Sequence, residues 1–255
     1  MNAIFAVVNE IVGWLRQRAT AANARGFAVG LSGGVDSAVV ARLCHLATPG
    51  QVAAVILPCG NDPHDEADAL LVAEVFDIVP ARIDLEPVYE AFVSQASPAL
   101  DMLPAQMRPA TDETADLIAL GNVRPRLRMA ALYFLANSLG YLVAGTGNRS
   151  ELTVGYFTKY GDGGVDVLPI GHLLKSEVRA LAKELGVPQA IIDKVPSAGL
   201  WQGQTDEAEM GFSYADLERY LAHGPEAVSP ALALRLERII RATEHKRMLP
   251  PTPES

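Results

Sequence analysis

The chain has 255 residues, of which 49% are hydrophobic and 20% charged, a size that suits one sizeable domain rather than several enzymatic modules. Its formal net charge of -9 argues against a nucleic-acid partner, because binding along phosphates needs a basic face. Two cysteines, Cys44 and Cys59, are too few for a disulfide scaffold, and without a signal-peptide pattern or a membrane-length apolar run we expect a cytoplasmic protein with no membrane partner.

The first part of the chain alternates predicted helices and strands. Apolar residues at helical spacing predict an amphipathic helix that ends before residues 19–26. Short apolar runs predict the strands 27–31, 52–57 and 79–85, and the intervening periodicity predicts the helices 36–46 and 65–76 and a helix that begins near Pro87. This alternation predicts an α/β fold, an open parallel sheet with helices on both faces.

Further along, the periodicity fades from Gln95 to Arg108, and prolines predict a surface loop there. A long helix follows from about Glu113 to Leu139, which Gly121 and Pro125 should bend or break near residue 122. The strand 141–144 then ends in a glycine-rich turn.

The C-terminal part is predicted to be mainly helical. The predicted helices are 173–185, a short one from Pro188, 214–221 with Ser213 as its cap, and 231–243 with Ser229 as cap and Pro230 as first residue. Between them, the segment 196–210 is rich in Gly, Gln, Ser and acids, which suits a mobile lid or an exposed connection.

A glycine-rich loop lies between the first predicted strand and the next helix, at Gly30–Ser37 with the sequence GLSGGVDS. This is the place where open α/β sheets bind ligands and where a helix N-terminus offers N–H groups to an anion. Without Cβ atoms, Gly33 and Gly34 can adopt unusual backbone angles and let phosphate oxygens approach the main chain. Ser32 and Ser37 supply hydroxyl donors, so the loop is predicted to bind phosphates.

Asp36 in this loop would repel a bare phosphate, which indicates a Mg²⁺ ion that bridges to the phosphates. No Gly-Lys-Ser/Thr follows, so this is not the Walker loop. It resembles instead the pyrophosphatase loop Ser-Gly-Gly-x-Asp-Ser, whose families cleave ATP between the α and β phosphates and leave an adenylated intermediate. The alternative is a Gly-Gly turn that only closes a strand–helix connection.

Five further blocks narrow the resemblance: 121–128 (GNVRPRLR), 145–151 (GTGNRSE), 155–166 (GYFTKYGDGGVD), 200–206 (LWQGQTD) and 243–247 (TEHKR). Together with the loop they resemble the ammonia-dependent NAD synthetases over about residues 11–247. The resemblance implies one synthetase domain over 1–255, with no glutaminase domain. It also implies a Rossmann-like fold of the adenine nucleotide alpha hydrolase type.

The resemblance also implies roles for individual residues. ATP would lie on Gly30, Leu31, Ser32, Gly33, Gly34, Val35, Asp36, Ser37, Thr146, Lys175 and Ser197, the last being Thr in many family members. Mg²⁺ would be held by Asp36 and Glu151, and deamido-NAD by Arg126, Lys159, Asp166, His245 and Lys246. The residues expected to take part in catalysis are Asp36, Lys175 and Asp166.

The activity implied is the ATP- and Mg²⁺-dependent amidation of deamido-NAD with ammonia, through an adenylated carboxylate, to NAD, AMP and pyrophosphate. Asp162 is an alternative to Asp166 as the group that holds ammonium or accepts its proton. The resemblance implies a homodimer whose interface uses the long helix near Arg126. A separate glutaminase that supplies the ammonia stays open.

Several of these residues also have a purely structural interpretation. Arg124, Arg126 and Arg128 can form one solvated helix face; family spacing favours function for Arg126 and leaves Arg124 and Arg128 undecided. Glu151 can be a first-turn acid that stabilises a helix dipole. The acidic residues around His64 are better explained as a helix start than as a metal site.

Three rival functions remain. One is another adenylating ligase or a tRNA-modifying enzyme, although the acidic balance disfavours the latter. A second is a dehydrogenase, because Gly145–Ser150 with Asp166 further on weakly imitates the dinucleotide fingerprint, without its third glycine. The third is a nucleotide sensor that binds ATP without producing AMP.

Overall fold

The computed structural model describes residues 3–60, 62–107, 113–197 and 205–253. Its centre is a four-stranded sheet in the order β3-β2-β1-β4, in which every pairing is parallel. The strands are β1 (Gly26–Gly30), β2 (Val52–Ile56), β3 (Ala81–Arg82) and β4 (Tyr141–Val143). The α/β fold with a parallel sheet is confirmed.

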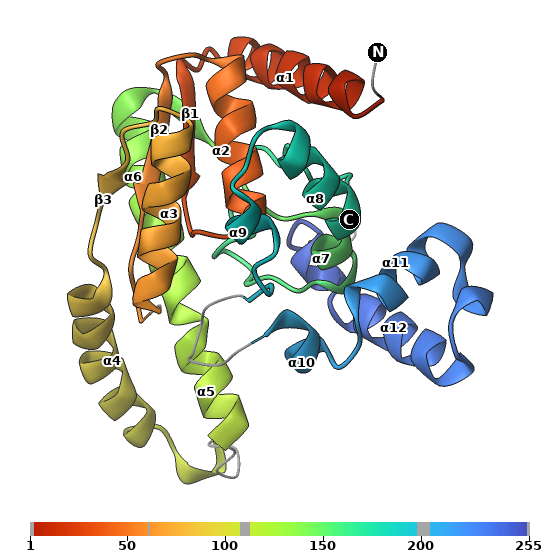
Figure 1. The fold of residues 1–255 in the computed structure, drawn as a ribbon. Helices are drawn as coiled ribbons and strands as arrows, with labels where there is room; N and C mark the ends of the chain where they lie inside the picture. The colour runs from red at the N-terminus through yellow and green to blue at the C-terminus, as the bar shows by residue number, and fades with distance from the viewer. Residues whose placement is uncertain (1–2, 61, 108–112, 198–204, 254–255) are drawn as a thin grey trace.

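Helices cover both faces of this sheet (Figure 1). One face carries α1 (Ala3–Ala21), α2 (Val35–Ala47), α3 (Pro63–Val75), α8 (Lys175–Glu184) and α9 (Gln189–Ile192). Their apolar sides pack on the sheet and form with it the largest core cluster. This cluster includes the fully buried Leu15 and Leu43 from the helices and Phe27 from β1. The other face is covered by α6 (Val123–Leu139), which packs on β1 and β4.

The region between β2 and α6 differs most from expectation. The predicted strand 79–85 is reduced to the two exposed residues of β3, and Val79 before it is 92% exposed. The predicted loop from Gln95 is wrong up to residue 101, because α4 (Glu86–Asp101) continues through Pro98. Tyr89 at the start of α4 packs against the core, but Pro98 lies in the exposed second half of the helix, where the distortion that a proline introduces meets no core packing.

The break predicted near residue 122 is confirmed. Helix α5 (Glu113–Gly121) ends there and α6 begins one residue later, at Val123. Pro125 falls in the first turn of α6, where its missing N–H would have had no intrahelical partner. A 3-10 turn at Ala105–Met107 precedes α5.

The C-terminal part is helical as predicted. It contains α7 (Arg149–Val154), α10 (Asp206–Met210), α11 (Tyr214–His223) and α12 (Pro230–Ala242), with 3-10 turns at Pro225–Ala227 and Glu244–Lys246. Ser213 and Ser229 accept the cap hydrogen bonds of α11 and α12. These helices share a separate small core and lie to one side of the sheet (Figure 1).

The structure describes only part of the segment 196–210, which was predicted to be a lid or an exposed connection. Residues 198–204 lie outside the described residues, and 206–210 form α10 rather than a loop. Both cysteines are buried and unbridged. Across the described ranges, no helix is both long and apolar enough to cross a membrane.

Leu43 and Leu70 give a matched test of where the core lies. Leu43 on α2 is fully buried, whereas Leu70 on α3 is 49% exposed. We expect Leu43→Ala to lower the free energy of unfolding by about 2–5 kcal/mol through the cavity it leaves. Leu70→Ala should change it by less than about 0.5 kcal/mol. Urea unfolding of both variants measures this, and equal losses would contradict the described packing.

Candidate active site

The loop after β1 depends on one glycine for its shape. Gly33 has φ +78°, and a Cβ atom there would lie 2.4 Å from the carbonyl oxygen of Asp65 at the start of α3. Gly34 has φ -94°, an ordinary value, and a Cβ there would meet only the Ser32 Oγ at 3.5 Å. Of the two glycines, only Gly33 has a backbone angle or a close contact that demands glycine.

The hydroxyls of the loop hold it closed on itself. The Ser32 Oγ donates to Ser37 Oγ at 3.0 Å, and the Ser37 Oγ donates to the Gly34 carbonyl at 2.9 Å. Gly34 is the N-cap of α2 and supplies no side chain to its first turn. The first N–H groups of α2 therefore have no side-chain cap and can bind an anion.

A cavity of about 1290 Å³ opens at the carboxyl ends of β1, β2 and β4. The loop lines one wall, through Ser32, Gly34, Asp36 and Ser37. Opposing walls come from residues after β4 and from the helical C-terminal part. This is the edge at which parallel sheets of this kind bind ligands.

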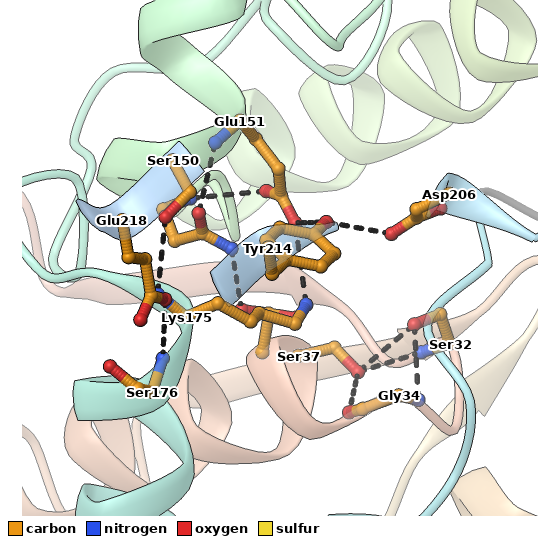
Figure 2. Close-up of polar contacts among 12 residues, drawn as sticks. Ser32, Gly34, Ser37, Ser150, Glu151, Lys175, Ser176, Asp206, Tyr214 and Glu218 are labelled. Carbon is orange, nitrogen blue, oxygen red and sulfur yellow. Dashed lines mark hydrogen bonds and ion pairs between the residues drawn. The ribbon is translucent and has the colours of Figure 1, made fainter. Parts of the chain in front are cut away.

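The side-chain ammonium of Lys175, which lines this cavity, pairs with the carboxylates of Asp36 and Glu151. Figure 2 shows Lys175 beside Glu151. The Lys175 Nζ donates to Asp36 Oδ2 and lies 3.3 Å from Glu151 Oε1. The Lys175 side chain is 4% exposed, and each carboxylate 16%. The three residues come from α8, α2 and α7, so the fold assembles this centre from distant parts of the chain.

Asn148 orients both carboxylates. Its Nδ2 donates to Asp36 Oδ1 at 3.1 Å, and its backbone N–H donates to Glu151 Oε2 at 3.2 Å. Its Oδ1 in turn accepts from the Glu151 N–H, which completes a capping box at the start of α7. Asn148 was not predicted as a site residue, although the Asn-x-x-Glu spacing of a capping box is visible in the sequence.

The charged groups of this centre shift one another's pKa values. Burial raises the pKa of Glu151 to about 7, with Lys175 opposing the shift and Asp36 adding to it. Burial also disfavours the Lys175 ammonium, but the Asp36 and Glu151 carboxylates outweigh it and hold its pKa above the ordinary value. Lys175 therefore stays charged and compensates the two acids.

Tyr214 completes the centre from the side of α11 (Figure 2). Its hydroxyl lies 2.8 Å from Asp206 Oδ2 and 3.2 Å from Glu151 Oε1, and the Lys175 Nζ lies 5.3 Å from the centre of its ring. Tyr214 is 5% exposed and Asp206 4%. Burial, with the nearby carboxylates of Glu151 and Asp206, raises the pKa of Tyr214.

The donor set fits a Mg²⁺ ion. Asp36 and Glu151 bring two carboxylates together beside a loop suited to phosphates, and Mg²⁺ in proteins is commonly held by one or two carboxylates and substrate phosphates. The ion pairs with Lys175 show that positive charge is favoured between them. Among the described residues, no group of three or more acidic, His or Cys side chains forms a metal cage.

Most of the predicted ATP residues line the cavity. They are Gly30, Leu31, Ser32, Gly34, Val35, Asp36, Ser37, Thr146, Lys175 and Ser197, whereas Gly33 packs against α3 instead. Lys246 also lines the cavity, but its Nζ donates to the carbonyls of Gly155 (2.7 Å) and Phe157 (2.8 Å). In this structure the Lys246 side chain therefore stabilises the turn at residues 155–157 by hydrogen bonds to its carbonyls.

The other predicted deamido-NAD residues lie outside the cavity lining. Arg126 donates to the Lys159 carbonyl at 3.4 Å, and the Lys159 Nζ donates to the His245 carbonyl at 2.5 Å. Asp166 accepts from the Tyr133 hydroxyl at 2.9 Å and the Val143 N–H at 2.8 Å. The structure therefore does not bring Asp166 to the Lys175 centre, and both its oxygens are engaged at the end of β4.

Two further cations line the cavity, Arg128, which the sequence left undecided, and Lys194, which it did not indicate. Arg128 donates to the carbonyls of Leu57 and Cys59, each at 3.2 Å, after β2. Lys194 Nζ pairs with Asp65 and Asp68 on α3. Neither contact follows from sequence spacing, because each joins segments more than 60 residues apart.

The acidic segment before α3 is a helix start, as expected. Asp62 caps α3 by accepting from the His64 N–H at 2.9 Å, and Glu66 pairs with Arg82 at 2.7 Å. Arg124, the other undecided arginine, lies over the Tyr89 ring at 4.6 Å.

Lys175→Met tests the charge balance of the centre. It leaves Asp36 and Glu151 facing each other without their cation, which we expect to lower the free energy of unfolding by about 3–5 kcal/mol. Added Mg²⁺ should restore more stability to this variant than to the wild type. Thermal unfolding with and without Mg²⁺ measures both effects. Lys183→Met, an exposed change on the same helix, is the control, and equal unfolding of the two variants would contradict the role of Lys175.

Known proteins resemble this chain over its full length. The family model for NAD synthase matches residues 7–250. An NH(3)-dependent NAD(+) synthetase from Carboxydothermus hydrogenoformans is 48% identical over 244 residues, which cover 96% of this chain and 95% of the relative.

Two solved structures have the same fold. The NMN synthetase from Francisella tularensis is 39% identical with a TM-score of 0.87, and covers 100% of both chains. The NH3-dependent NAD synthetase from Campylobacter jejuni, in complex with the nitrate ion, is 28% identical with a TM-score of 0.78 and the same coverage. The chain belongs to the NAD synthase family of amide-forming ligases.

Proposed function

We propose that this enzyme amidates deamido-NAD with ammonia, at the expense of ATP, to give NAD, AMP and pyrophosphate. The observation that carries the proposal is the Lys175 centre, which lies with the phosphate-binding loop in one cavity. Family membership supports the amide-forming reaction. The site adds the residues that would carry it out.

In the first step, a nicotinate carboxylate oxygen attacks the α-phosphorus of ATP. A P–O bond forms and the bond to the β-phosphate breaks, so that pyrophosphate leaves. The first N–H groups of α2 and the Lys175 ammonium would neutralise charge on the leaving group. Asp36 and Glu151 would hold a Mg²⁺ ion, which supplies further charge neutralisation when bound.

In the second step, ammonia attacks the adenylated carboxyl carbon, the bond to AMP breaks and the nitrogen loses a proton. Asp162 is better placed to accept that proton than Asp166, because it lines the cavity. Its side chain is exposed along the cavity, and its Oδ1 accepts from the Thr158 N–H at 2.8 Å, which holds the carboxylate in place.

The pyridine substrate could be a dinucleotide or a mononucleotide. The sequence relative is named an NAD synthetase, whereas the Francisella structure is named an NMN synthetase. Arg126, Lys159 and His245 lie together outside the cavity lining, where they would reach the far half of a dinucleotide. We favour deamido-NAD on this ground and treat nicotinate mononucleotide as the competing substrate.

A homodimer is the second part of the proposal. Helices α4, α5 and α6 expose large apolar side chains, including Phe92, Leu100, Leu117 and Phe134, of which Phe134 is 69% exposed. Exposed apolar surface of this extent commonly marks an interface. A dimer through α6 would place Arg126 of both protomers near the contact.

A product assay tests the reaction. Purified protein is incubated with ATP, Mg²⁺ and either deamido-NAD or nicotinate mononucleotide, with ammonium or glutamine as nitrogen source. We expect NAD and AMP in equal amounts from deamido-NAD and ammonium, and a kcat/KM on nicotinate mononucleotide at least about 10-fold lower, as loss of the far contacts would give. ATP cleavage without amide product would refute the substrate, and no AMP at all would refute the adenylation.

Phe134→Glu tests the dimer. A charge at the centre of an apolar interface opposes association, so we expect this variant to become monomeric at concentrations where the wild type is dimeric. Leu234→Glu is the control, because Leu234 is 50% exposed on α12 in the helical C-terminal part. Analytical ultracentrifugation reads the mass of each. Equal masses for the wild type and Phe134→Glu would contradict this interface.

A further inference from the structure

Tyr214 contacts both Glu151 and Lys175 from the start of α11. Its hydroxyl reaches Glu151 Oε1 at 3.2 Å, and its ring lies beneath the Lys175 ammonium, 5.3 Å from ring centre to Nζ. Glu151 Oε1 is also the oxygen that Lys175 approaches at 3.3 Å. The hydroxyl and the ammonium thus approach the same carboxylate oxygen, which has lone pairs for both.

The position of Tyr214 is fixed on several sides. Ser213 caps α11, so Tyr214 is the first residue of that helix, and its N–H donates to Glu207 Oε1 at 2.9 Å. Its ring belongs to the small core formed by α7, α11 and α12. The hydroxyl also lies 2.8 Å from Asp206 Oδ2 on the preceding helix, so its one hydrogen is shared between this carboxylate and Glu151. A side chain held in this way can impose its position on Glu151.

We propose that Tyr214 is a positioning residue that orients Glu151 for a divalent cation and supports the Lys175 ammonium on its ring. The shared hydroxyl hydrogen would hold Glu151 Oε1 in one orientation, beside Asp36 across the Lys175 ammonium. Groups that orient a metal-binding carboxylate typically contribute about 10- to 100-fold to metal affinity. Through Tyr214, the position of α11 becomes part of the cation centre.

This inference rests on the proposed function, since it assumes a cation held by Asp36 and Glu151. Two substitutions separate the two actions of the side chain. Tyr214→Phe keeps the ring under Lys175 and removes the hydroxyl, whereas Tyr214→Leu removes both. Tyr220→Phe is the matched control, because it deletes a hydroxyl six residues further along the same helix.

The experiment measures Mn²⁺ binding by the free-ion resonance signal, with α,β-methylene-ATP as a nucleotide that cannot be cleaved. We expect Tyr214→Phe to weaken Mn²⁺ binding on the order of 10-fold. Its affinity for the nucleotide without metal should stay within about twofold of wild type, because the Lys175 support remains. Tyr214→Leu should weaken both affinities, and Tyr220→Phe neither.

Glu151→Gln distinguishes failure of this inference from failure of the proposed function. If Glu151→Gln and Tyr214→Phe both leave Mn²⁺ affinity unchanged, the cation site itself is wrong. If Glu151→Gln weakens binding while Tyr214→Phe does not, the site stands and the role of Tyr214 is overturned. Melting temperatures of all variants are measured alongside. If the Mn²⁺ affinities follow only the melting temperatures, Tyr214 has a merely structural role and the inference also fails.

Discussion

A lysine ammonium buried between two carboxylates is the constraint on which the site depends. Lys175 is nearly inaccessible to solvent, and an unpaired charge at that depth would be costly. The cost is offset only if α2, α7 and α8 bring Asp36 and Glu151 to it together. The packing of these helices on the sheet is therefore also the assembly of this charged centre. The fold itself holds the Lys175 ammonium in place in the cavity.

The buried parts of the fold were predictable from the sequence because their patterns are local. Strands β1 and β2 are short apolar runs, and the caps Ser213 and Ser229 sit directly before periodic segments. The start of helix α4 near Pro87 was predicted correctly, whereas strand β3 and the end of α4 were misjudged because their residues are exposed, so burial imposes no pattern on them. Pro98 there indicated a loop, but the exposed end of a surface helix tolerates it.

The candidate site likewise has a part that the sequence predicts and a part that it does not. The loop at Gly30–Ser37 was predictable because a tight turn, small residues and a helix N-terminus all follow one another in the chain. The contacts of Tyr214 and Arg128 were not, since they join segments that only folding brings together. Resemblance assigned Asp166 a catalytic role that its hydrogen bonds to Tyr133 and Val143 do not support within one chain.

The order of these segments along the chain has a consequence for synthesis on the ribosome. The loop and Asp36 emerge early, Lys175 more than a hundred residues later, and Tyr214 and Lys246 near the end. A nascent chain that ends with the last strand, at Val143, contains Asp36 but not Lys175. When residues 155–157 follow, Lys246, which stabilises their turn, has not yet been made. The charged centre is therefore completed late in translation, after the helical C-terminal part has left the exit tunnel.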